Sequence, residues 1–152
     1  MNIAWLTSAT VSLLAAAILG TAMSVETPDR LEPCPRTPNC VSTQATRESQ
    51  RMHPIPYRGD LETARSLLLE VLDGEPRVDV ADVRERVIRT VFTTRLMRFR
   101  DDVIFLLDPN DQLIHFRSAS RIGRSDWGTN RRRMKRLSER FLEAERSQES
   151  TP

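Results

Sequence analysis

Arginine, serine, aspartate and asparagine side chains gather in one turn-rich segment, residues 117–133, whose sequence is RSASRIGRSDWGTNRRR. Arg117 and Arg121 lie four residues apart, with Ser118 and Ser120 between them. Guanidinium groups and hydroxyls can hold a carboxylate or phosphate through charge-assisted hydrogen bonds, and the two glycines free the backbone to turn sharply. The same residue types could equally stabilise a turn through bonds within the chain. The segment therefore predicts either an anion-binding site or a structural turn.

Side-chain alternation along a strand would put Arg117 and Arg121 on one face and the two serines on the other. Two arginines that point together suit the bidentate capture of an anionic group. Carboxylates inside the chain are the alternative partners, because the adjacent Asp101 and Asp102 begin a neighbouring predicted strand and could lie beside the arginines. We interpret these two aspartates as a structural acidic pair.

The end of the segment predicts the start of a helix. Ser125 and Asp126 can bond nearby backbone amides in a turn, and Thr129 is a candidate helix cap. Arginines then fall in the first helical turn, where the macrodipole disfavours a cation by about 0.3–1 kcal/mol. Either an internal acid such as Asp126 or a bound anion is expected to compensate. The candidate ligand-binding residues are therefore Arg117, Ser118, Ser120, Arg121, Ser125, Asp126, Asn130 and Arg131.

Catalysis is the weaker interpretation of these residues. A nucleophilic serine needs a neighbouring base, and Ser120 with His115 is the least implausible pair, His53 being the other histidine of the chain. No Gly-x-Ser-x-Gly elbow surrounds any serine. Asp101 and Asp102 point to opposite faces if they lie in a strand, so they cannot easily share one substrate. Binding is favoured over hydrolysis, and no cofactor is expected.

Cys34 and Cys40 are the only cysteines, and the five residues between them include two prolines and an asparagine. That composition favours a compact turn, which can bring two Cα atoms within the roughly 4.4–6.8 Å that a disulfide needs. We therefore predict a disulfide. A redox-active pair is disfavoured because its usual two-residue spacing at a helix start is missing. A metal site is disfavoured because no histidine lies close by in the sequence.

The N-terminal segment Ile3–Met23 carries no charged residue. Small residues permit cleavage by a signal peptidase before Met23 or Val25, yet the segment is also long enough to remain as a membrane anchor. We expect residues 1–24 to form an apolar helix that is a signal peptide or an anchor, with the rest exported into the periplasm or held outside the cytoplasm. The alternative is a buried N-terminal helix of a cytosolic domain.

A chain of 152 residues with 39% apolar content is enough for one domain with a modest core. Residues 84–140 hold 15 Lys or Arg against 7 Asp or Glu, whereas the rest of the chain holds 8 against 14. A basic half can recruit an anionic molecule or an anionic lipid surface, although interspersed charges are more often a solvated face. Nucleic acid is not expected as a partner, because the basic run has no interleaved aromatic residues that could stack on bases.

Hydrophobic periodicity predicts an α+β fold in which a small antiparallel sheet is packed by two helices. The order of the elements, a helix, then strands, then a helix, argues against an alternating parallel-sheet fold. The expected elements are an edge-like piece at Met52–Tyr57, a helix from Leu61 to Asp73 capped by Asp60 and ended by Gly74, a loop or short strand at Glu75–Asp82, strands at Val83–Thr94, Arg100–Asp108 and Leu113–Arg117, and a helix at Asn130–Arg146.

The sequence predicts that the chain is divided into four parts. Residues 25–50 are expected to form the cysteine-containing loop and a linker, residues 51–146 the α+β domain, and residues 147–152 a disordered polar tail. These parts follow the apolar segment at residues 1–24.

Three blocks of the sequence resemble the domain of unknown function 1499 family: CPRTPNCVS at residues 34–42, FRDDV at residues 99–103, and the segment at residues 117–133. The resemblance spans about Leu31 to Phe141. It implies a single exported or membrane-associated domain in bacteria, with relatives in photosynthetic eukaryotes. It implies no catalytic assignment.

The sequence therefore favours an exported envelope protein that binds an anionic small molecule or an envelope component through Arg117, Arg121 and the helix start near Asn130. The first alternative is a structural or interaction module whose basic helix, Arg131–Arg146, docks on an acidic partner. The second alternative is a hydrolase.

Overall fold

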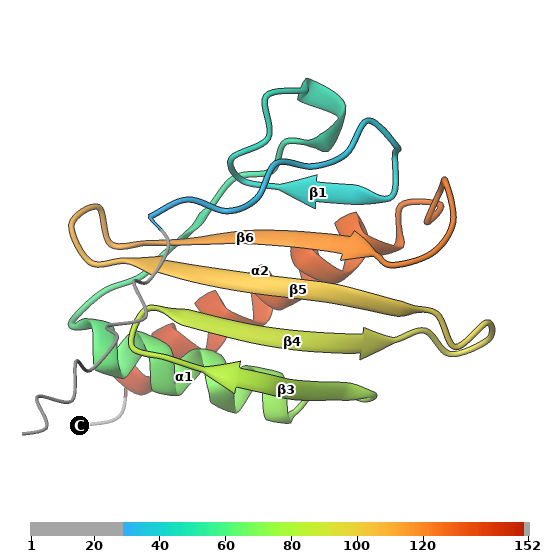
Figure 1. Ribbon diagram of the computed structural model, residues 1–152. Helices are drawn as coiled ribbons and strands as arrows, with labels where there is room; N and C mark the ends of the chain where they lie inside the picture. The colour runs from blue at the N-terminus through green and yellow to red at the C-terminus, as the bar shows by residue number, and fades with distance from the viewer. Residues whose placement is uncertain (1–28, 151–152) are drawn as a thin grey trace, which may run out of the picture.

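A computed structural model describes residues 29–150, which form an antiparallel sheet with two helices on one of its faces (Figure 1). This confirms the predicted α+β class. The predicted apolar helix at residues 1–24 lies outside the described residues. Within residues 29–150, no helix combines the length and the apolar character that crossing a membrane requires.

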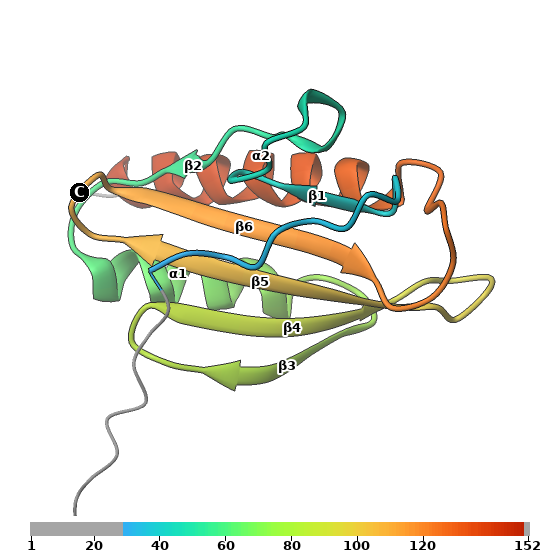
Figure 2. The ribbon, with the colours of Figure 1, turned by 45° about the horizontal axis from the view of Figure 1, so that its top comes forward.

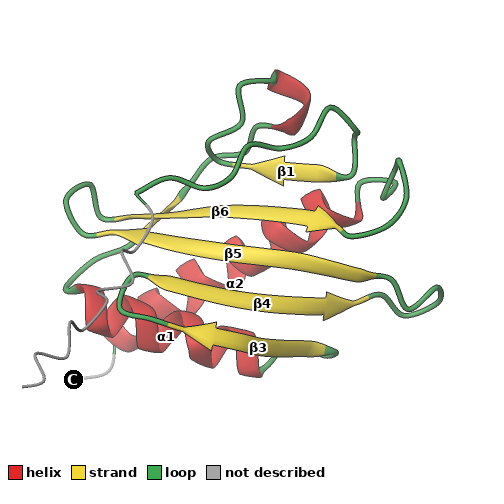
Figure 3. Ribbon diagram, in the orientation of Figure 1, coloured by secondary structure: helices red, strands yellow, loops and turns green. Residues whose placement is uncertain are grey.

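The strands of the sheet follow the order β1-β6-β5-β4-β3, and β2 pairs with the same edge of β6 as β1 does. Figure 3 shows the strands as one layer with both helices behind it. The elements are β1 (Cys40–Ser42), the short 3-10 turn η1 (Glu48–Gln50), β2 (Ile55–Pro56), α1 (Leu61–Asp73), β3 (Val78–Val83), β4 (Val87–Thr93), β5 (Arg100–Asp108), β6 (Leu113–Ser120) and α2 (Thr129–Glu149).

Helix α1 begins and ends where the sequence predicts. The Asp60 carboxylate accepts a hydrogen bond from the Thr63 backbone N–H at 2.7 Å, which caps the first turn. Apolar residues at helical spacing then turn one face to the sheet, and Leu68 and Leu72 have no exposed surface. Gly74 follows the helix beside the Arg140 guanidinium, and a Cβ at this position would lie 2.6 Å from an Arg140 nitrogen.

The β5–β6 hairpin is also confirmed, and it is longer than predicted. Strand β6 continues to Ser120, so that Asp101 pairs with Ser120 and Asp102 pairs with Ala119. Alternation along β5 and β6 then separates a face covered by the helices from an open face. Phe105 and Phe116 lie opposite each other on the helix-covered face, where neither has exposed surface. The extension carries the last residues of β6 to the end of the sheet.

The strand predicted at Val83–Thr94 is confirmed as β4, but it begins four residues later than predicted, at Val87. The short strand allowed at Glu75–Asp82 is confirmed as β3, which includes Val83. Strand β3 ends at Val83, and the Arg84 backbone N–H donates to the Val87 carbonyl at 2.8 Å across the turn into β4. The apolar alternation continues through this turn, so it does not mark the break. Val87 and Ile88 are both buried because β4 is covered on its two faces, by the segment around Leu31 and by the helices.

Two further boundaries differ from the sequence division. Residues 40–42 form β1 and pair with β6, so the cysteine-containing segment adds a strand to the sheet instead of acting as a separate linker. Helix α2 continues to Glu149, into the predicted disordered tail. The Arg58 guanidinium holds both Glu149 carboxylate oxygens at 2.7 and 2.9 Å, which fixes this last turn against the segment before α1.

Glu75 joins the two helices. Its carboxylate, whose side chain is 2% exposed, accepts from the Arg136 guanidinium at 2.9 Å and from the Arg140 guanidinium at 2.5 Å. Burial raises the pKa of Glu75, but the hydrogen bonds and positive charges of the two arginines outweigh it and leave the pKa below its ordinary value of 4.5. A carboxyl with a lowered folded-state pKa stabilises the fold fully above its unfolded pKa and loses that contribution as pH falls through the folded pKa.

We therefore expect Glu75→Gln to lower the free energy of unfolding by about 2 kcal/mol at neutral pH, the scale of a hydrogen bond to a charged group. The difference from the parent protein should begin to shrink as pH falls below about 4.5, the ordinary pKa, and should disappear once pH has fallen through the lowered pKa of Glu75 in the folded parent. Urea unfolding at several pH values measures this. Glu139→Gln, at a 65% exposed side chain on α2, is the control. Parallel pH curves for Glu75→Gln and the parent would contradict the prediction.

Candidate binding pocket at the end of the sheet

A buried ion pair ties α2 to the start of β5. The Arg133 guanidinium donates to Asp101 Oδ2 at 2.5 Å, and the two side chains are 6% and 1% exposed. The guanidinium carbon also lies 4.8 Å from the centre of the Phe92 ring, within cation–π distance. Burial removes both charges from water, so each depends on the other for its solvation.

Asn130 extends this pair into a polar network. Its Oδ1 accepts from the Ser118 hydroxyl and from Arg133, both at 2.6 Å. Its Nδ2 donates to the Asn39 carbonyl at 3.1 Å and to Ser120 Oγ at 3.2 Å. Ser118 and Asn130 have no exposed surface. These predicted ligand-binding residues therefore share the helix-covered face and bond to one another.

Asp126 supplies the negative charge at the start of α2. Its Oδ1 accepts from the Gly128 N–H at 3.0 Å, and its Oδ2 accepts from the Asn130 N–H at 2.7 Å. Gly128 is the N-cap and has a left-handed φ of 77°, which glycine adopts without steric cost. Thr129 is the first residue of the helix, so the predicted threonine cap is wrong. The cap passes to Asp126 because Gly128 has no side chain that could accept these bonds.

The two arginines of the predicted anion site lie on the side of the open face. Arg121 donates to both oxygens of Asp102 at 2.7–3.1 Å, and both side chains are about two-fifths exposed. Arg117 stands between Ile104 and Ser42 in the strand register. Its Nε is buried and bonds to no described residue. The predicted acidic pair therefore divides: Asp102 holds Arg121, while Asp101 holds an arginine of α2.

Most arginines of the basic helix have partners within the fold. Arg131 donates to the backbone carbonyls of Ser49 at 2.8 Å and Arg51 at 3.2 Å, which ties α2 to η1. The remaining pairs are Arg132 with the Trp127 carbonyl, Arg133 with Asp101, and Arg136 and Arg140 with Glu75. These contacts tie the helix to the rest of the fold, and Arg131, Arg132 and Arg136 keep exposed surface.

A pocket of about 250 Å³ opens where β5 begins and β6 ends. Asp101 lines it, and Oδ1 of this buried carboxylate accepts no hydrogen bond from the described residues. An acceptor that is buried and unused calls for an explanation, and a donor bound in the pocket would supply one. Among residues 29–150, no arginine or lysine lines the pocket. Its other polar residues are Thr94, Ser120, Ser125, Asp126 and Thr129.

The wall of the pocket is apolar. It consists of Leu96, Met97 and Phe99 from the β4–β5 loop and of Ile122 and Trp127 from the β6–α2 loop. Figure 2 shows these two loops at the same end of the sheet. All five side chains are exposed, Leu96 by 88% and Trp127 by 86%. The site therefore combines a polar floor with an apolar rim.

The residues proposed for hydrolysis do not come together. Ser120 lies on the helix-covered face of β6, whereas His115 lies on the open face, where its Nδ1 is 3.1 Å from Thr43 Oγ1. A Ser120–His115 dyad is therefore not formed. Within residues 29–150, no group of three or more His, Cys, Asp or Glu side chains is placed to hold a metal ion.

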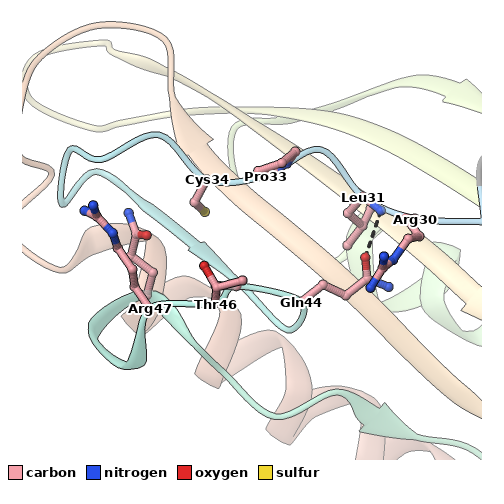
Figure 4. Close-up of a pocket in the computed structure, with 9 residues that line it drawn as sticks. Arg30, Leu31, Pro33, Cys34, Gln44, Thr46 and Arg47 are labelled. Atoms are coloured by element: carbon pink, nitrogen blue, oxygen red, sulfur yellow. Dashed lines mark hydrogen bonds between the residues drawn. The ribbon is translucent and has the colours of Figure 1, made fainter.

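The predicted disulfide between Cys34 and Cys40 is confirmed, with Cα atoms 5.7 Å apart. A second pocket, of about 370 Å³, lies beside it. Figure 4 shows Arg30 and Arg47 at opposite ends of this pocket, and a hydrogen bond from the Leu31 N–H to Gln44 crosses its edge at 2.9 Å. This bond joins the segment before Cys34 to the loop that follows β1.

Of the predicted ligand-binding residues, the end pocket brings together Ser120, Ser125 and Asp126. The structure puts Arg117 and Arg121 on the other side of the sheet. Sequence reasoning missed the apolar rim, although one signal was present: the run TRLMRFR at residues 94–100 carries apolar residues between arginines, without the alternation that a half-buried strand would show.

Comparison with known proteins agrees with the resemblance seen in the three sequence blocks. A search of curated proteins finds no match. The model of the family described as "Protein of unknown function (DUF1499)" matches residues 30–141. This range covers every strand of the sheet and reaches the last buried residue of α2. The chain therefore belongs to the DUF1499 family of proteins of unknown function.

Proposed function

We propose that this protein is an exported envelope domain that binds an amphipathic ligand in the pocket at the end of the sheet. The observation that carries the proposal is Oδ1 of Asp101, a buried carboxylate oxygen without a described partner in the pocket lining. Such an oxygen accepts hydrogen bonds only, so the matching ligand group is a hydroxyl or an amine. Asp126, a second carboxylate in the lining, favours the amine.

The rim defines the other part of the ligand. Five apolar side chains surround the polar floor, and apolar surface removed from water contributes about 25 cal/mol per Å². A short hydrocarbon chain or ring would cover these side chains while its donor group reaches Asp101. Small-molecule sites typically have an apolar wall and a small number of polar groups that converge on the ligand.

Anion binding, which the sequence favours, has less support in this geometry. Arg121 already holds the carboxylate of Asp102, and Asp126 already occupies the start of α2. Arg117 keeps one buried N–H without a described partner, so an anion site on the open face stays a prediction. The two proposals call for ligands of opposite charge, and one titration can therefore separate them.

Two features support the proposed location outside the cytoplasm. The Cys34–Cys40 disulfide suits an oxidising compartment such as the periplasm. The uncharged segment Ile3–Met23 has the composition of a signal peptide or an anchor.

The test uses Trp127 as a reporter. The chain contains Trp5 and Trp127, so Trp5→Phe leaves one tryptophan, on the rim of the pocket. The protein, isolated from cells that produce the full chain, is titrated with hexylamine, hexanol and hexanoate, which share one apolar chain. We expect hexylamine to bind at least about tenfold more tightly than hexanoate, with hexanol between them, because a carboxylate beside Asp101 is repelled.

Ile122→Gln should weaken binding of hexylamine, because it puts a polar amide into the rim. The matched control is Val83→Gln, at a 44% exposed side chain on β3 that does not line the pocket. Tighter binding of hexanoate than of hexylamine, reported by Trp127, would overturn the proposal that the pocket binds an amine. No response of Trp127 to any of the three compounds would overturn the pocket proposal.

A further inference from the structure

The exposed large apolar side chains of the described residues are concentrated at one end of the sheet. Leu96 and Met97 in the β4–β5 loop are 88% and 67% exposed, and Ile122 and Trp127 in the β6–α2 loop are 64% and 86% exposed. The remaining exposed large apolar residues are Phe99, at the end of the first loop, and Val80 and Val83 on β3. Soluble proteins rarely gather such side chains on adjacent loops without a binding role.

Positive charge surrounds these apolar residues. Arg95, Arg98 and Arg100 are exposed in or beside the β4–β5 loop, and Arg124 is exposed in the β6–α2 loop. None of these four arginines forms an ion pair with an acidic residue among residues 29–150. Residues 94–100 contain no acid, and the one acid of residues 121–129, Asp126, caps α2. The end of the sheet is therefore both apolar and cationic.

We infer that these two loops dock the protein on a membrane surface rich in anionic lipid. Leucine, methionine and isoleucine can enter the edge of the acyl region, and tryptophan prefers the headgroup level. An arginine close to an anionic surface contributes about 1 kcal/mol to binding. The loops thus present the two kinds of group that an anionic bilayer surface attracts, in adjacent positions.

A second copy of the chain is a poorer occupant, because a symmetric contact at this end would bring the arginines of both copies together. An acidic protein partner would also complement the positive charge of these arginines. The observation that favours a membrane is the uncharged segment Ile3–Met23, since a signal peptide or an anchor brings the chain to a membrane in either case. The inference does not depend on a ligand in the end pocket, because it rests on exposed loop residues and on charge.

The experiment measures the depth of Trp127 directly. The full chain with Trp5→Phe is mixed with vesicles of phosphatidylcholine alone, or of phosphatidylcholine with phosphatidylglycerol, whose acyl chains are brominated. On the anionic vesicles we expect a blue shift of the Trp127 emission and quenching by bromine, and we expect both to weaken at high salt. Phosphatidylcholine vesicles should leave Trp127 exposed even where the N-terminal segment attaches the chain to them.

Two variants separate the contributions. Leu96→Glu should abolish the quenching. Combined Arg95→Gln, Arg98→Gln and Arg124→Gln should lower the equilibrium constant for docking of the loops on anionic vesicles, read from the quenching of Trp127, roughly a hundredfold, at about fivefold for each guanidinium. Arg146→Gln is the control, because this exposed arginine lies near the opposite end of α2. Circular dichroism spectra establish that each variant is folded.

Three results would overturn the inference. The first is equal Trp127 emission on both kinds of vesicle. The second is quenching that survives Leu96→Glu. The third is a blue shift that depends on protein concentration and needs no lipid, which would assign the loops to contact between copies. Binding of hexylamine in the pocket would stand in all three cases, so the two proposals fail separately.

Discussion

Replacing Arg133 with methionine is expected to lower the free energy of unfolding by about 3–5 kcal/mol, the scale for removing one partner of a buried ion pair. The substitution leaves Asp101, at 1% exposure, without the cation that solvates it. Folded domains are stable by only about 5–15 kcal/mol, so much of the stability should be lost. Urea or thermal unfolding monitored by circular dichroism measures the effect.

The chain contains its own control for this prediction. Asp102 and Arg121 form an ion pair of the same residue types one position along β5, but on the open face and about two-fifths exposed. Arg121→Met should therefore lower the free energy of unfolding by no more than about 1 kcal/mol. Arg133→Met combined with Asp101→Leu should recover most of the loss, since a buried pair can often be exchanged for apolar side chains. Equal losses for the two arginine variants would contradict the burial argument.

Replacing Asn130 with alanine is expected to lower the free energy of unfolding by about 3 kcal/mol. The substitution removes the acceptor of Ser118 and Arg133 and the donor to Ser120 and to the carbonyl of Asn39. A buried polar group left without a partner costs about 1–3 kcal/mol, and partial repacking will recover some of the sum. A lower urea midpoint with an unchanged m-value would establish a loss of stability alone.

Asn110→Ala is the matched control for Asn130→Ala. Asn110 is exposed in the β5–β6 turn, where its backbone N–H donates to Asp108 Oδ1 at 2.9 Å and does not depend on its side chain. We expect Asn110→Ala to change the free energy of unfolding by no more than about 0.5 kcal/mol. A loss of that size for Asn130→Ala as well would show that the network around Asn130 contributes little to stability.

These two predictions also bear on the end pocket. Arg133 binds Oδ2 of Asp101 and leaves Oδ1 free of described partners, so the network orients the carboxylate that lines the pocket. Ser120 belongs both to the network and to the pocket lining. A weakened network should therefore change ligand affinity at the pocket even in variants that remain folded. The strongest test of that coupling is hexylamine binding by the Asn130→Ala protein below its unfolding temperature.

The elements that the sequence predicted well depend on neighbours along the chain. Asp60 precedes an apolar face of helical period, so α1 follows from capping and periodicity alone. Strands β5 and β6 flank a turn with Pro109 and Asn110, so their hairpin is a local event. The disulfide was predictable because the short segment between Cys34 and Cys40 contains two prolines and turns so that the two cysteines lie close together.

The sequence by itself determined the α+β class, the helix caps near Asp60, the cysteine bridge and the family, because short-range periodicity, turn composition and spaced motifs carry that information. Only the tertiary structure decided which aspartate each arginine meets. Asp101 and Asp102 are neighbours in sequence, yet the pleat of β5 sends one under α2 to Arg133 and the other to Arg121 on the open face. The rim likewise depends on the tertiary structure, because the pairing of Asp101 with Ser120 puts the start of β5 beside the end of β6 and so brings together two loops that lie far apart in the sequence.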